Sequence, residues 1–323
     1  MTQPFTLVLG GGGLLGKAVR AVASRRSGGR VIDKRVRWSE PDHVTADLEA
    51  GLDRLISLAD GGTWRVAWCA GVGVTSTARD DLEREVDVLR GFMTAVVDRA
   101  RSSASDGKAA VFLASSAGGV YSGSSGPPFT EHTEARPLAP YGEAKLAAEG
   151  VVRDICGAGG VPALIGRIGN LYGPGQNLLK PQGLITHLCR SHVTGQPTSI
   201  YVSLDTLRDY IYVQDCAEMV VDGFERLEKY RAEEPGSGSV VTKIIASQRS
   251  LSVGALLMES RRVFRRPLRI LVASSPYSKA QVRDLRLRSV VWPELDRRSL
   301  TPLPVGISAT IADLEQRMGG AHR

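Results

Sequence analysis

The chain has 323 residues, a formal net charge of +7 at pH 7 and 42% hydrophobic residues. This length is typical of about two domains, each large enough to bury its own core. Aromatic residues make up only 6% and are not interleaved with the basic ones, which argues against nucleic acid as a partner. The densest basic region indicates either a solvated face or a site for an anion such as a diphosphate; its arginines are Arg261, Arg262, Arg265, Arg266, Arg269, Arg283, Arg286 and Arg288.

The cysteines are isolated from one another in the sequence, at positions Cys69, Cys156, Cys189 and Cys216. This spacing argues against a zinc site or a disulfide framework and fits a reducing compartment. The N-terminus shows no basic segment followed by a signal-length apolar run, and no stretch reaches the length of a membrane span. We therefore expect a cytoplasmic protein with no metal site and no membrane partner.

A glycine-rich loop follows the first predicted strand, residues 6–9, and precedes a predicted helix over 17–24. Glycines at every third position of this loop allow a tight turn, let backbone N–H groups approach a pyrophosphate and bring the helix close to the strand. The pattern predicts a dinucleotide-binding loop, and its expected cofactor contacts are Gly10, Gly13, Leu14, Leu15 and Gly16.

The choice of cofactor depends on the end of the second predicted strand, residues 30–33, where Asp33 stands. A carboxylate there accepts hydrogen bonds from the adenosine ribose and disfavours a 2′-phosphate, so NAD is expected. Lys34, Arg35 and Arg37 follow directly and are the kind of side chains that receive a phosphate, which keeps NADP as the alternative. The competing interpretation is that Asp33 is only a turn residue.

A third strand is predicted over residues 44–48, with Asp47 and Leu48 facing the adenine. The competing interpretation makes Asp47 the cap of a helix that starts near Glu49. The fourth predicted strand, 64–70, runs into small residues at 71–73, which suit a backbone that lies along the cofactor through Ala70 and Gly71.

The fifth predicted strand, residues 110–114, follows a helical apolar period over 82–101 and delivers Ser115 and Ser116 at its carboxyl end. Ligands bind at that end of the strands in open α/β sheets. A helix predicted from Pro140 to about Cys156 carries Tyr141 and Lys145 four residues apart, hence on one face. A lysine ammonium stabilises a neighbouring phenolate, and a serine hydroxyl can hold the oxygen whose proton the tyrosine takes. Alone, this pair is more often an ordinary pair on a helix face.

A sixth strand over residues 163–168 completes the alternation of strands and helices, which predicts a parallel, doubly wound sheet. Five stretches in this order together resemble the extended short-chain dehydrogenase/reductase family, in its nucleotide-sugar epimerase and dehydratase branch. These stretches are residues 10–16, 115–121, 140–145, 167–175 and 208–215.

The resemblance implies an NAD(P)-binding Rossmann domain over residues 1–168, with later returns near 202–217 and 240–246. It also implies a smaller, mixed α/β substrate-binding domain that occupies most of 169–323. In that arrangement Tyr141 is the base, Lys145 binds the nicotinamide ribose and Ser116 holds the substrate hydroxyl, with Ser115 as the lesser candidate. Arg167 joins the cofactor-binding set.

The substrate implied by the resemblance is a nucleoside diphosphate sugar, and three residues are implied as its contacts. Asn170 matches a position that touches the substrate near its phosphates; the competing interpretation is that it only shapes the loop before Tyr172. Arg208 matches an arginine that contacts the diphosphate; the competing interpretation is a surface ion pair with Asp209. Arg286 or Arg288 is expected to complete the clamp, and we select Arg288. The family pairs its long helices into a homodimer, for which Val86, Met93, Ala147 and Val151 are the candidate apolar positions.

One departure from the family pattern bears on the reaction. Dehydratases carry Asp-Glu just after the hydroxyl residue, where this chain has Ala117, Gly118 and Gly119, so dehydration is disfavoured. We expect an NAD-dependent epimerase, most simply at C4 through a 4-keto intermediate. The alternatives are a nucleotide-sugar 4-ketoreductase that consumes NAD(P)H and, less favoured, a relative that binds NAD(P) without catalysis. The sequence does not identify the sugar, the nucleotide, the carbon or the pathway.

Overall fold

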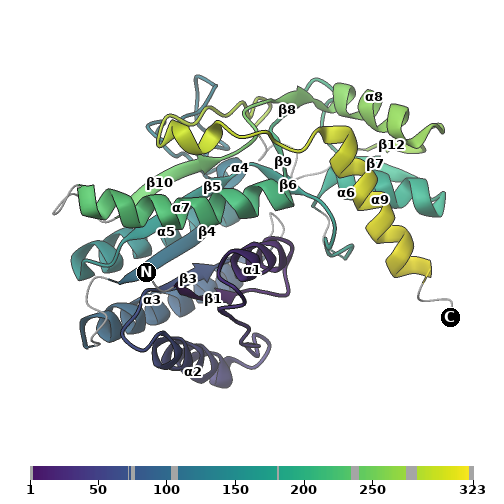
Figure 1. Cartoon of the computed structure of the whole chain (residues 1–323). Helices are drawn as coiled ribbons and strands as arrows, with labels where there is room; N and C mark the ends of the chain where they lie inside the picture. The colour runs from purple at the N-terminus through teal and green to yellow at the C-terminus, as the bar shows by residue number, and fades with distance from the viewer. Residues whose placement is uncertain are drawn as a thin grey trace.

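The computed structural model describes residues 3–71, 73, 77–102, 108–179, 182–233, 240–273 and 282–319. Figure 1 shows a larger lobe built around one sheet and a smaller lobe beside it that carries the C-terminal helix. Val72, which we expected beside the cofactor together with its glycine neighbours, lies outside the described residues. None of the helices in the described part of the chain combines the length and hydropathy of a membrane span.

The larger lobe is built on a six-stranded sheet of order β10-β5-β4-β3-β1-β2. Its neighbouring strands all run parallel, and β3 and β5 are buried along their whole length, as a sheet covered on both faces requires. This arrangement confirms the predicted doubly wound fold. The strands are β1 (Phe5–Leu9), β2 (Val31–Ile32), β3 (Trp64–Trp68), β4 (Ala109–Ser116), β5 (Ala163–Ile168) and β10 (Val240–Ile245).

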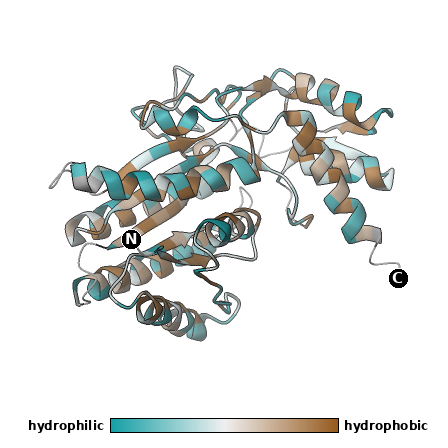
Figure 2. Cartoon of the chain, viewed as in Figure 1, coloured by the Kyte–Doolittle hydropathy of each residue, from teal (hydrophilic) through white to brown (hydrophobic). Residues whose placement is uncertain are grey.

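Helices cover both faces of this sheet. On one face lie α1 (Leu14–Arg26) and α7 (Val213–Glu233), and on the other α2 (Pro41–Ala59), α3 (Arg79–Ser102) and α5 (Pro140–Gly159). In Figure 2 the central strands are mostly hydrophobic, whereas the helices alternate hydrophobic and hydrophilic residues. Each helix therefore buries one stripe against the sheet.

The expected strand at residues 44–48 is wrong, because these residues lie inside helix α2. Pro41 stands at the first helical turn, a position that its fixed φ and missing N–H suit. Val44, Leu48 and Leu52 are buried at intervals of four residues, which is a helical period. Five residues are too few to display that period, and it becomes visible only over the full helix.

In the described residues of the smaller lobe there are three short two-stranded sheets and three helices. In the sheets, β6 (Asn170–Tyr172) pairs with β9 (Tyr210–Tyr212), β7 (Thr198–Ile200) with β12 (Ile270–Val272), and β8 (Leu207–Arg208) with β11 (Leu251–Ser252). The helices α6 (Leu184–Thr194), α8 (Val253–Phe264) and α9 (Leu303–Gly319) share one core. Two further short helices are α4 (Ala117–Val120) and η2 (Pro293–Asp296).

Two parts of the chain beyond residue 168 return to the larger lobe. Strand β10 extends the sheet beside β5 with six paired residues, as predicted for residues 240–246. In the predicted return over 202–217, the beginning of α7 and Ile211 of β9 pack into the core beside the main sheet, while β8 and β9 pair within the small sheets.

Candidate active site

A cavity of about 1520 Å³ lies between the two lobes. At one end it is lined by Gly10 and Ala70, which follow β1 and β3, and at the other by Arg190 and Tyr201 of the smaller lobe. The carboxyl ends of the parallel strands therefore open into it, which is where open α/β sheets bind their ligands.

The glycine loop after β1 is shaped by contacts that only glycine allows. Gly10 has a φ of +81°, and a Cβ there would lie 2.6 Å from the amide nitrogen of Ala70. A Cβ at Gly16 would collide with the carbonyl oxygen of Gly10, whereas one at Gly12 would meet nothing within 4 Å. The helix that follows has no side-chain cap at Gly13, and its first residues, Leu14 and Leu15, line the cavity. This loop fits the pyrophosphate of a dinucleotide, as predicted.

Asp33 lies beside this loop, where the sequence predicted a ribose-binding acid. Its Oδ1 is 3.5 Å from the position that a Cβ of Gly11 would take, and its side chain is 62% exposed. Asp33 forms an ion pair with Arg20 of α1, a cation that the sequence analysis did not single out. Arg20 lies on α1, 13 residues before Asp33 in the sequence, so only the folded structure reveals the pair.

Asp47 does not face the adenine end of the cavity. Its carboxylate accepts hydrogen bonds from Arg37 at 3.1 Å from the backbone nitrogen and 2.9 Å from Nε, while Lys34 Nζ lies 3.3 Å away. The hydrogen bonds from Arg37 hold the pKa of Asp47 well below its usual range. Asp47 thus anchors the loop after β2, and Leu48 is buried in the core. The residues that line this end of the cavity are Trp38, Pro41 and Val44.

Tyr141 and Lys145 both line the cavity from the first turns of α5. Lys145 Nζ lies 5.8 Å from the centre of the Tyr141 ring and 3.4 Å from where a Cβ of Gly71 would stand. The lysine therefore reaches the segment that follows β3, at Gly71. Two of the three predicted catalytic side chains lie together at the end of the cavity nearest the cofactor loop.

Ser116 is brought to the same place by the short helix α4, which it caps. Its Oγ accepts a hydrogen bond from the N–H of Gly119 at 3.2 Å, and a Cβ on Gly119 would lie 3.2 Å from Tyr141 Cε1. Gly119 thus lies between Ser116 and Tyr141, and the lack of a side chain at this position keeps the two close. The Ser116 hydroxyl retains its proton for donation to a ligand.

Ser115 points to a buried polar network instead. Its Oγ donates to Glu149 Oε1 at 2.7 Å, and Glu149 also pairs with Arg167, whose Nη2 lies 2.7 Å from Oε2. Arg167 Nη1 donates to the Tyr121 hydroxyl at 2.7 Å. Burial alone would raise the pKa of Glu149, but the hydrogen bonds and charge of Arg167 outweigh it, so that the pKa of this carboxyl is lowered.

This network decides the placement of two predicted residues. Arg167 is buried and does not line the cavity, so the structure does not bring it to the cofactor. It holds the end of β5 against α5 through Glu149, to which Ser115 also joins the end of β4. Because the Ser115 hydroxyl is committed to Glu149, the geometry favours Ser116 as the hydroxyl that meets a substrate.

On the smaller lobe, Asn170 and Arg208 line the cavity as expected. Arg208 is 8% exposed, and its Nη1 donates to the carbonyl oxygens of Leu207 at 2.9 Å and Val282 at 2.7 Å. Burial lowers the pKa of Arg208, which means that its charge is poorly solvated and that an anion in the cavity would stabilise it. Asn170 forms a side-chain hydrogen bond with Tyr210.

Arg288 is exposed and does not line the cavity. The chain is extended here, so alternate side chains face opposite ways: Leu285 and Leu287 are buried, while Arg286 and Arg288 point outward. Leu285 lines the cavity instead, and Arg286 forms an ion pair with Asp284 at 2.8 Å. The expectation that Arg288 completes the diphosphate clamp is therefore not met.

The sequence analysis missed four charged residues that line the cavity, namely Asp81, Arg84, Glu85 and Arg190. Arg190 of α6 lines it three residues after His187, and this helical spacing was the available signal. Glu85 of α3 also lines it and accepts a hydrogen bond from the N–H of Gly73 at 3.2 Å. Asp87 of the same helix also lines the cavity, while Glu85 holds the segment after β3 through this hydrogen bond.

Together the glycine loop and the Tyr141–Lys145 pair define a dinucleotide-dependent α/β enzyme of the short-chain dehydrogenase type. The model of the NAD dependent epimerase/dehydratase family matches residues 6–234, and the chain belongs to that family. This membership confirms the resemblance found in the sequence, and NAD is the family's cofactor.

Curated relatives match over shorter stretches. A dTDP-4-dehydro-6-deoxyglucose reductase of Escherichia coli is 32% identical over 136 residues, which are 41% of this chain and 42% of that protein. An uncharacterized UDP-glucose epimerase, YtcB of Bacillus subtilis, is 31% identical over 107 residues, 33% of each chain. The chain thus aligns with less than half the length of these relatives.

Among solved structures, MoeE5 in complex with UDP-glucuronic acid and NAD has a TM-score of 0.76 and 23% identity. The match covers 97% of this chain and 99% of MoeE5. It establishes that the fold of both lobes is shared.

Proposed function

We propose that the protein is an NAD-dependent epimerase of nucleoside diphosphate sugars, most simply at C4 through a 4-keto intermediate. The observation that carries this proposal is one continuous cavity. It joins the dinucleotide loop, the cluster of Ser116, Tyr141 and Lys145, and the buried cation Arg208. The cluster supplies acid–base chemistry next to the cofactor, and Arg208 supplies a partner for the diphosphate.

In this mechanism the Ser116 hydroxyl donates a hydrogen bond to the sugar oxygen, and Tyr141 takes the proton of the C4 hydroxyl. NAD, when bound, supplies the acceptor and later the donor of the hydride. Lys145 holds the nicotinamide ribose and stabilises the tyrosine phenolate by its charge. After the ketone has turned in the cavity, Tyr141 returns the proton to the oxygen. Dehydration is disfavoured because Ala117, Gly118 and Gly119 offer no acid to expel water.

The second candidate is a nucleotide-sugar 4-ketoreductase, in which Ser116, Tyr141 and Lys145 run the same chemistry in the reducing direction. The observation in its favour is the likeness to the reductase of Escherichia coli. A reductase consumes one reduced cofactor for each product, whereas an epimerase recycles its own. We therefore expect the purified protein to interconvert UDP-glucose or dTDP-glucose and the C4 epimer without added cofactor. If turnover stopped unless NADPH were added, the protein would be assigned as a reductase and not as an epimerase.

We predict that NAD binds at least about tenfold more tightly than NADP, a difference of roughly 1.4 kcal/mol. Asp33 accepts from the ribose hydroxyls and disfavours a phosphate there, although Arg20, Lys34 and the exposed Arg35 lie close. Substitution Asp33→Ala should weaken NAD binding and narrow this preference, as measured by titration with both cofactors. Glu40→Ala, at an exposed acid of the same loop, is the matched control. If Asp33→Ala left the preference for NAD over NADP unchanged, Asp33 would be only a turn residue.

We also predict a homodimer through α3 and α5. Met93 and Val151 are buried in the core and cannot supply the contact, and Val86 packs partly against the same core. Ala147 is exposed, and Cβ atoms added at Gly91 or Gly150 would meet nothing within 4 Å, so small residues leave this face open to close helix approach. Light scattering should give twice the monomer mass at micromolar concentration, and Ala147→Arg should shift it toward the monomer. A monomeric wild type would contradict the dimer.

A further inference from the structure

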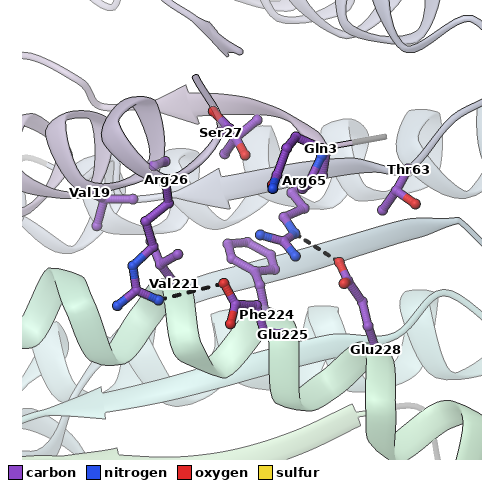
Figure 3. Close-up of a pocket in the computed structure, with 13 residues that line it drawn as sticks. Gln3, Val19, Arg26, Ser27, Thr63, Arg65, Val221, Phe224, Glu225 and Glu228 are labelled. Carbon is purple, nitrogen blue, oxygen red and sulfur yellow. Dashed lines mark hydrogen bonds and ion pairs between the residues drawn. The ribbon is translucent and has the colours of Figure 1, made fainter. Parts of the chain in front are cut away.

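A second cavity, of about 290 Å³, lies at the opposite edge of the main sheet from the candidate active site. Residues before and within the first part of β1 and β3 line it, together with the C-terminal part of α1 and the middle of α7 (Figure 3). Its lining includes Thr6, Arg26, Arg65, Phe224 and Glu228. Neither the family relationship nor the proposed reaction uses this place.

The feature that distinguishes this cavity is Arg65, which projects from the second residue of β3. Its side chain is only 8% exposed. Nε donates to Glu228 Oε1 at 2.8 Å, and the guanidinium lies 5.4 Å from the centre of the Phe224 ring. Among the described residues, Nη1 and Nη2 have no hydrogen-bond partner. Neither nitrogen is among the fully buried polar atoms that lack a partner, so both are open to the cavity, where water or a ligand can satisfy them.

The neighbouring cation is already neutralised. Arg26 donates to Glu218 Oε2 at 2.5 Å and also pairs with Asp222, and Figure 3 shows it turned toward Glu225. Arg65 is itself ion-paired with Glu228 through Nε, so what it offers the cavity is the edge formed by Nη1 and Nη2. Because Glu225 and Glu228 also line the cavity, a dianion such as phosphate would be repelled more strongly than a single carboxylate, which can accept hydrogen bonds from both nitrogens of this edge.

Part of the remaining wall is suited to a hydrocarbon group, beside the polar Gln3, Ser27 and Thr63. Val19, Ala23 and Val221 line the cavity and are almost fully buried, as is the methyl-bearing Thr6. The volume is at the lower end for ligand sites, which are typically about 300–1,000 Å³. A ligand with a short branched or cyclic body and one anionic group fits this combination of size, apolar wall and single available cation.

We propose that this cavity binds a small organic monocarboxylate. Its two oxygens accept the Nη1 and Nη2 hydrogen bonds of Arg65 in the paired geometry that guanidinium and carboxylate share. Its hydrocarbon part rests against Val19, Ala23 and Val221. The hydrogen bond from Arg65 to Glu228 and the contact with the Phe224 ring hold the guanidinium so that Nη1 and Nη2 face the cavity.

The test uses 3-methylbutanoate as the probe and neutral 3-methylbutanamide, of the same shape, as its control. We expect saturation-transfer NMR and titration of the full-length protein to give a dissociation constant for the acid below about 10 mM. The amide and inorganic phosphate should each bind at least about tenfold more weakly. This measurement needs no turnover, so it stands or falls independently of the proposed reaction. Absence of acid binding at this concentration would overturn the proposal, as would equal binding of the amide or of phosphate.

Substitutions locate the probe. Arg65→Met keeps the length and apolar stem of the side chain and should weaken binding of the acid at least about tenfold. Glu228→Gln removes a rim charge, keeps a hydrogen-bond acceptor for Nε and should leave binding equal or tighter. If Arg65→Met does not fold, the side-chain NMR signals of Arg65 in the wild type test the site instead. These signals should shift when the acid is added and should not shift when the amide is added. Unchanged binding in folded Arg65→Met, or unchanged wild-type signals, would contradict the site.

Discussion

Substitution Tyr141→Phe is expected to lower the turnover of a nucleotide sugar by about 10²–10⁴-fold, the range of a lost general acid–base group. Phenylalanine keeps the ring that lies against Gly73 and Gly119, so only the hydroxyl disappears. Cofactor binding should persist, because the glycine loop and Lys145 are untouched. Interconversion of UDP-glucose or dTDP-glucose and its epimer gives the rate, and titration with NAD gives the affinity.

Tyr230→Phe is the matched control for this experiment. Tyr230 lies on α7 against Trp292, away from the cavity, so removing its hydroxyl should leave the rate unchanged. If Tyr141→Phe retained more than about a tenth of the wild-type rate, the proton would have to be moved by another group, and the assignment of Tyr141 as the base would fail.

Substitution Glu149→Gln is expected to lower the free energy of unfolding by about 3–5 kcal/mol, because it leaves the buried charge of Arg167 without its counter-ion. Glu149 is fully buried and accepts from Ser115, Arg153 and Arg167. Urea denaturation at one fixed protein concentration measures the loss. Glu143→Gln, at a half-exposed acid on the same helix, should change the stability by less than about 1 kcal/mol.

Two further measurements connect the loss to the pair. In the double variant Glu149→Gln/Arg167→Met no buried charge is left unpaired, so its stability should exceed that of Glu149→Gln alone. If the losses of stability from the two single substitutions simply added up in the double variant, the ion-pair explanation would be contradicted.

The pKa of Glu149 is lowered in the folded state. The stabilisation by its carboxylate is therefore present above the unfolded pKa of about 4.3 and is lost as the pH falls through the lower folded value. The wild type and Glu149→Gln should converge in acid.

The elements with a long or strongly punctuated pattern were predictable. The glycine loop after β1, the strand ending at Ser116 and the helix that carries Tyr141 and Lys145 were all expected where they lie. Each has several concordant local signals, such as an apolar run, a turn residue and a regular spacing. The strand expected at residues 44–48 had only a short apolar run, which α2 also produces.

The side chains whose placement failed depend on contacts between distant parts of the chain. Arg167 matched the family pattern by its position, but the orientation of its side chain is set by Glu149, 18 residues earlier. The placement of Asp47 depends on Arg37, and that of Arg288 on the register in which residues near Leu287 meet Phe129. Such partners are not encoded in local spacing, which is why sequence patterns found the face of α5 that lines the cavity and misplaced some of the residues around it.

Strand β10 joins the main sheet only after the chain has passed through much of the smaller lobe. On the ribosome, β5 therefore remains an open sheet edge, with unpaired N–H and C=O groups, until residues 240–245 have left the exit tunnel. The two lobes cannot form one after the other as independent units, and synthesis delivers the larger one in an incomplete form. A break in the chain before residue 240 would thus expose a surface that invites aggregation, even though the glycine loop and helix α5 would already be present.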